Sequence, residues 1–107
     1  MAGQGTTTIN FGTFPGSPDA QVTITGQTGI TGTSLVEAWV FPTATADHSV
    51  DEHWADPPEV MAGNIVAGTG FTIYGVAKTR EGSGIQRERS NNNSNPYGLW
   101  TVAWVWN

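Results

Sequence analysis

The chain has 107 residues, no cysteine, only 12% charged residues and a formal net charge of −5. This length allows one domain with a single modest core, which excludes a large multidomain enzyme. The lack of cysteine excludes disulfide bonds, thiolate metal sites and a cysteine nucleophile. No apolar run approaches the roughly 18 residues of a membrane-spanning helix, and the first residues lack the features of a signal peptide. We therefore expect a soluble domain without a membrane partner.

The basic residues are concentrated in one short stretch. All four lie within residues 78–89 together with Glu81 and Glu88, so this stretch carries +2 and the rest of the chain −7. An acidic body of this kind repels phosphates, which argues against a nucleic-acid partner. The low content of charged residues also indicates that protein partners cover part of the surface.

Apolar residues that recur at every second position predict six strands. In chain order these strands cover residues 6–11, 21–25, 34–41, 60–67, 70–77 and 99–106.

Turn-forming residues separate these runs and indicate the fold class. Segments rich in Gly and Pro at residues 15–19 and 26–32 are typical of turns, and Gly68-Thr69 predicts a tight hairpin. The only helical candidate is one turn near residues 49–54. Together these features predict a single all-β domain over residues 1–107, an antiparallel β-sandwich of six to eight strands of the jelly-roll or immunoglobulin-like type.

Residues 79–96 differ from the rest of the chain, because they are first charged and then rich in Ser and Asn. Such a segment has no apolar face to bury. We predict a long polar loop between the last two strands, and loops of this length are often functional.

A dense polar cluster at residues 47–54 contains both histidines of the chain. Imidazole and carboxylate groups suit zinc, so His48, Asp51 and His53 are candidate metal ligands. Three residues separate His48 from Glu52, however, and this spacing fits neither zinc-protease pattern. A surface loop with caps and local hydrogen bonds is therefore favoured over a metal-dependent hydrolase that uses the two histidines. Serines outside any nucleophile elbow and glycines outside any phosphate-binding motif give no catalytic residue and no cofactor.

The five tryptophans are the remaining candidates for contact with a partner or ligand, because indole rings anchor interfaces and stack on sugars. They are Trp39, Trp54, Trp100, Trp104 and Trp106. The last three share one strand face with Val102, which allows three interpretations: core, subunit interface or carbohydrate platform. The loops at residues 47–56 and 80–95 complete the expected contact surface.

Several segments resemble small structural proteins of tailed-bacteriophage virions. The resemblance is carried by the Thr/Gly-rich start of the chain and by residues 37–43, 45–53, 62–74 and 99–107. It implies a cysteine-free β-sandwich present in many copies on a capsid, neck or tail, commonly as a trimer, with no catalytic residues.

The resulting prediction is a non-enzymatic virion structural protein. As a homo-oligomer bound to other virion proteins, it would decorate or cement the capsid or form part of a head or tail fibre. The alternative is a carbohydrate-binding module that recognises a host glycan through exposed tryptophans.

Overall fold

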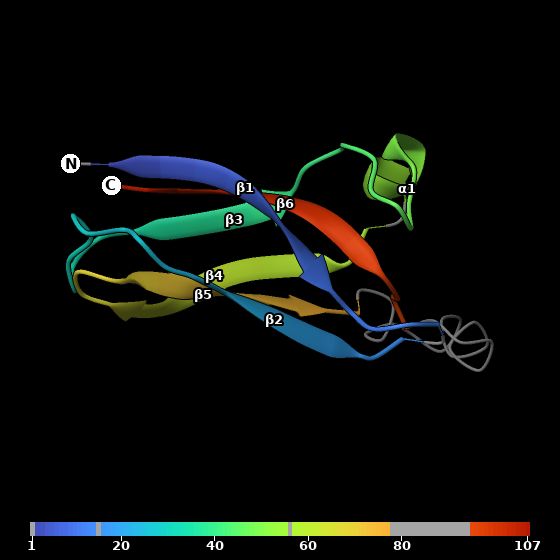
Figure 1. The fold of residues 1–107 in the computed structure, drawn as a ribbon, viewed down its shortest axis with the longest axis horizontal. Coiled ribbons are helices and arrows are strands. Elements are labelled where there is room, and N and C mark those ends of the chain that lie inside the picture. Colours follow the sequence, from blue (N-terminus) through green and yellow to red (C-terminus); the bar gives the residue numbers. More distant parts are fainter. Residues whose placement is uncertain (1, 15, 56, 78–94) are drawn as a thin grey trace, which may run out of the picture.

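The structure, a computed structural model, describes residues 2–14, 16–55, 57–77 and 95–107. These residues form two antiparallel three-stranded sheets and one short helix (Figure 1). One sheet has the strand order β1-β6-β3 and the other β2-β5-β4. The elements are β1 (Gly3–Asn10), β2 (Asp19–Ile24), β3 (Val36–Val40), α1 (Val50–Ala55), β4 (Glu59–Val66), β5 (Gly70–Val76) and β6 (Leu99–Trp106).

β6 is the central strand of its sheet, which explains its apolar composition. Trp100, Val102, Trp104 and Trp106, which share one strand face, all belong to the buried core. The neighbouring strand β1 makes room for these large rings with small residues. Gly5 pairs with Trp104, and a Cβ atom at Gly5 would lie only 2.6 Å from that indole ring.

The second sheet contributes the opposite layer of the core. Phe71 and Ile73 of β5 are almost completely buried, as is Ile24 of β2. The ring of Phe71 meets Trp104 edge to face, with centroids 5.4 Å apart, so the two layers contact each other directly. Burial of such rings is the main source of stability in a domain of this size.

The turn between β4 and β5 confirms the predicted tight hairpin. The Thr69 N–H donates to the Val66 carbonyl at 3.0 Å, and Gly68 has a positive φ of 74°, which glycine adopts without strain. β4 also contains a register shift between Gly63 and Val66, where Asn64 has a φ of 55°. A bulge of this kind twists an edge strand locally.

The predicted all-β class and the six strands are confirmed, with ends that shift by up to three residues. Helix α1 also lies where the sequence predicts one turn. Nearly all of the predicted loop at residues 79–96 lies outside the described residues. In the part of the chain that is described, no helix has the length and apolar character to span a membrane.

The layering places two edge strands together. β3 is at the edge of one sheet and β4 at the edge of the other, and the two run close to each other on the same side of the molecule (Figure 1). The connection between them contains α1, which lies at one end of this side. This corner holds both the polar cluster and the exposed tryptophans.

Candidate functional site

Helix α1 begins with a reciprocal capping arrangement. The Ser49 N–H donates to the Glu52 carboxylate at 2.8 Å, and the Glu52 N–H lies 3.3 Å from the Ser49 hydroxyl oxygen. The Ser-x-x-Glu spacing thus satisfies two N–H groups that the first turn of a helix leaves without partners. The Ser49 N–H lowers the pKa of Glu52 below its usual value of 4.5, and the adjacent His48 ring lowers it further. The cap explains why so short a segment is helical.

His53 is locked in place by the backbone on both sides of its ring. Its side chain is only 1% exposed. Nδ1 lies 2.7 Å from the Ser49 carbonyl, and Nε2 lies 3.0 Å from the Thr101 N–H. Because a carbonyl accepts and an N–H donates, Nδ1 carries the proton and Nε2 accepts. Neither nitrogen is left for a metal or a substrate.

His48 is buried against β6. Its ring stacks on Trp100 with centroids 3.9 Å apart and an interplanar angle of 23°. Nε2 donates to the Tyr97 carbonyl, and Nδ1 lies 3.3 Å from the Glu52 carboxylate. Both ring nitrogens therefore face oxygen acceptors, and the imidazole is held between α1 and the start of β6.

Two further side chains attach the same loop to β6. The Thr45 hydroxyl donates to the Leu99 carbonyl at 2.8 Å and accepts from the N–H groups of Asp47 and His48. The Asp47 carboxylate accepts from the Leu99 N–H at 2.8 Å. A Cβ atom at Gly98 would lie 2.6 Å from this carboxylate, so glycine is required there. We refer to residues 43–55 as the histidine loop.

The geometry of the histidine loop is that of a structural anchor. Among the described residues, no three His, Cys, Asp or Glu side chains are grouped so that they could hold a metal ion. His48 and His53 are bonded to the protein, while Asp51 is exposed in the first turn of α1. The polar atoms of this loop hold it on β6. The sequence favours a surface loop with caps and local hydrogen bonds. The cap is present, but His48 and His53 are buried and also bond to Tyr97 and Thr101, far away along the chain.

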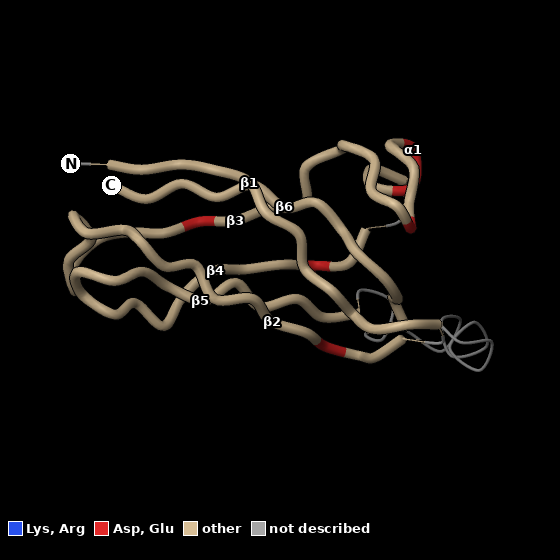
Figure 2. Tube along the Cα trace, in the orientation of Figure 1, with Lys and Arg blue, Asp and Glu red and all other residues tan. Residues whose placement is uncertain are grey.

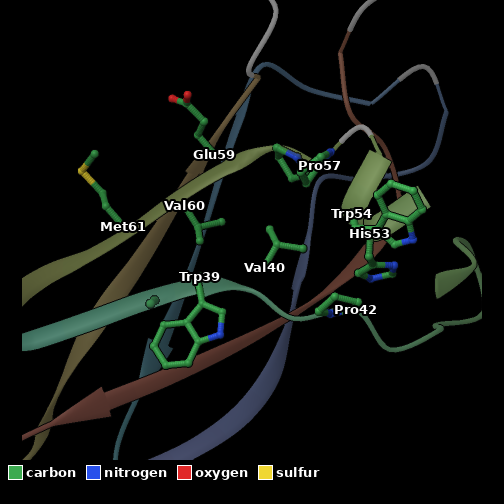
Figure 3. A pocket seen from close by; sticks show the side chains of 11 residues that line it. Trp39, Val40, Pro42, His53, Trp54, Pro57, Glu59, Val60 and Met61 are labelled. Carbon is green, nitrogen blue, oxygen red and sulfur yellow. The ribbon is translucent and has the colours of Figure 1, made fainter. Parts of the chain in front are cut away.

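Beside the loop, a shallow groove of about 440 Å³ runs between β3 and β4 (Figure 3). Val40 and Val60 point into the space between the two strands, while Trp39 points to the other side of β3. Apolar side chains dominate the lining, which consists of Ala38, Trp39, Val40, Pro42, His53, Trp54, Pro57, Pro58, Glu59, Val60 and Met61.

The rim of this groove exposes large apolar side chains. Trp54 is 66% exposed, Met61 64% and Trp39 43%, and Phe41 follows Trp39 on the same strand face. Single exposed apolar residues are normal on a protein surface, but a cluster of them around a groove is typical of a contact surface.

Among the described residues, the charged side chains at and near the groove are carboxylates. Glu59 lies in the lining and Glu37 is on the same strand as Trp39. All four Lys and Arg residues of the chain lie within residues 78–89, outside the described residues, so Lys and Arg are absent from the described part only (Figure 2).

The structure divides the five tryptophans into two groups. Trp100, Trp104 and Trp106 are each less than 9% exposed and pack between the sheets, so their ring faces are not available to a partner of the folded chain. The core interpretation describes these three, because β6 is a central strand with a sheet on its inner face. Trp39 and Trp54 line the groove and are the two tryptophans that a partner or ligand can reach.

Comparisons of the chain with protein-family models, with curated proteins and with solved structures found no match. The resemblance to virion proteins therefore stays a prediction from the sequence.

Proposed function

We propose that the chain is a non-enzymatic structural component of a bacteriophage particle, present as a homo-oligomer that contacts other particle proteins. The observation that carries this proposal is the exposed apolar rim of the groove. Trp39, Trp54 and Met61 would keep large apolar areas in water unless another protein covers them. On a particle with many copies, individually weak contacts of this kind add up to stable attachment.

The strand order supports a sandwich of the jelly-roll type. The first three strands alternate between the two sheets, and β1 pairs with β6 while β2 pairs with β5, as in a long ribbon folded over itself. In an immunoglobulin-like sandwich the first two strands share a sheet. Jelly rolls are common in viral capsid proteins and in lectins, and this chain differs from the usual form in having six described strands rather than eight.

The native mass of the purified chain tests the oligomer. Light scattering across a micromolar dilution series is expected to give a discrete trimer that resists dilution, and a stable monomer would contradict this part of the proposal. Quantitative mass spectrometry of purified virions of a phage whose genome encodes the chain tests its location. We expect a fixed copy number per particle, and its absence from the particles would refute a virion role.

A carbohydrate-binding module is the alternative, and the exposed indoles of Trp39 and Trp54 beside the groove are the observation in its favour. Ring faces of tryptophan stack on sugars. Quenching of tryptophan fluorescence by host polysaccharide in the wild type, together with its loss in Trp54→Ala, would favour this function. Silence across a broad panel of glycans would exclude it.

A further inference from the structure

The groove between β3 and β4 combines an apolar lining with a carboxylate, and these features indicate the kind of segment that it binds. We propose that it binds an extended polypeptide segment of another particle protein, in which an apolar side chain is flanked by Lys or Arg. This inference rests on the proposed function, because it names the kind of partner that covers the apolar rim. The lining, the edge of β3 and the charge at the groove support it.

The lining favours an apolar anchor over a sugar. Apart from Glu59 and His53, the residues that line the groove have apolar side chains or contribute only an indole N–H. His53 is already bonded through both ring nitrogens. Sugar sites need several polar side chains to bond hydroxyl groups, whereas an aliphatic side chain needs only the apolar floor formed by Val40 and Val60.

The edge of β3 provides backbone partners for an extended segment. The Phe41 N–H donates to Thr101, and the Leu35 carbonyl accepts from Asn107, so the odd-numbered residues of this segment bond to β6. In an antiparallel ladder the alternate residues then point their N–H and C=O groups away from the neighbouring strand. Ala38 is only 8% exposed, whereas Val40 is partly exposed. The backbone groups that an added segment can reach are therefore those of Val40, at the α1 end of the groove. Addition of a strand to an open sheet edge is a common mode of peptide recognition.

The charge of the surface selects a basic segment and disfavours a second copy of this groove. Contact between two such grooves would bring the Glu59 carboxylate of one copy toward that of the other, which costs free energy in a partly dehydrated interface. A Lys or Arg next to the apolar anchor reverses this effect. It can pair with Glu59 and lie on the face of Trp54.

Two synthetic peptides test this proposal. One is a fluorescein-labelled Gly-Ser-Lys-Leu-Lys-Leu-Lys-Gly-Ser, and the other has Glu in place of Lys. Fluorescence anisotropy with the full chain is expected to show saturable binding of the Lys peptide that weakens with added salt, and no binding of the Glu peptide. Glu59→Gln and Trp54→Ala are each expected to weaken the binding about tenfold, since both side chains are exposed and the fold does not depend on them.

Asp19→Asn is the matched control, because it removes one carboxylate from β2, the edge strand on the other side of its sheet (Figure 2). It should leave the affinity for the Lys peptide unchanged. Equal effects of Asp19→Asn and Glu59→Gln, equal binding of both peptides, or competition by a neutral oligosaccharide would overturn the proposal. If the peptide fails to bind while the chain is trimeric and present in virions, only this inference fails. If the chain is absent from virions, the proposed function fails whatever the peptide does.

Discussion

Helix α1 belongs to both the histidine loop and the groove, but two neighbouring side chains on it, His53 and Trp54, differ in burial and hydrogen bonding. Both His53 and Trp54 line the groove, but His53 is 1% exposed and bonded through both nitrogens, whereas Trp54 is 66% exposed. In the histidine loop, most of the polar side chains form hydrogen bonds within the protein. At the groove, large apolar side chains are exposed to solvent. A dense cluster of polar residues in a sequence is therefore a poor guide to a binding site when those residues satisfy the backbone.

The largest expected effect is the difference in the free energy of unfolding between substitutions at His53 and at Trp54. His53→Ala leaves the Ser49 carbonyl and the Thr101 N–H without their side-chain partner and opens a cavity beside Trp100, so we expect a loss of about 4 kcal/mol in the free energy of unfolding. Trp54→Ala should change it by no more than about 0.5 kcal/mol.

Urea unfolding followed by far-UV circular dichroism measures both variants without relying on the indole that is removed. His53→Gln serves as a second variant if His53→Ala does not fold, because an amide can restore part of the hydrogen bonding. Equal losses for His53→Ala and Trp54→Ala would mean that the histidine loop is not the structural anchor of this corner.

A smaller effect is expected at the glycine that faces the loop. Gly98→Ala introduces a Cβ atom 2.6 Å from the Asp47 carboxylate at a φ of 74°, so it combines backbone strain with loss of the bond to Leu99. We expect a loss of about 3 kcal/mol. Gly26→Ala has a similar φ of 80° and meets no atom within 4 Å, so it should show the strain alone, about 1 kcal/mol. Thermal unfolding of the two variants isolates the contact with Asp47, and identical losses would contradict its importance.

Removal of one hydroxyl tests the attachment further along the loop. Thr45→Val keeps the shape of the side chain but leaves the Leu99 carbonyl and two loop N–H groups without a partner, for an expected loss of about 2 kcal/mol. Met61→Ala on the rim of the groove is the comparison, and its exposed side chain should contribute almost nothing to unfolding. Chemical denaturation of both proteins measures the difference, and a costly Met61→Ala would show that the rim is part of the core.

The sequence predicts the strands because apolar residues recur at every second position. It leaves core, interface and carbohydrate platform open for Trp100, Trp104 and Trp106, and only the packing of the two sheets shows that they are core. The Ser-x-x-Glu spacing at Ser49 and Glu52 was a readable signal of the cap that begins α1. The partners of His48 and His53 could not be predicted, since Tyr97 and Thr101 are more than 40 residues away along the chain. The groove was equally hidden, because it exists only where the edges of two different sheets meet.

The smallest effect concerns the acidity of the cap. Glu52 has a lowered pKa because it accepts from the Ser49 N–H and lies beside His48, so its charged form stabilises the fold above the usual pKa of 4.5. This stabilisation is lost as the pH falls through the lowered pKa of the folded state. Glu52 is half exposed and screened, so Glu52→Gln should cost no more than about 0.5 kcal/mol at neutral pH, and the difference from wild type should shrink below pH 4.5. Asp51→Asn is the control, because it removes the same charge one residue earlier, where the described residues show no side-chain hydrogen bond to the carboxylate. It therefore separates loss of the charge from loss of the cap. Stability curves that diverge toward low pH would contradict a cap that acts through its charged form.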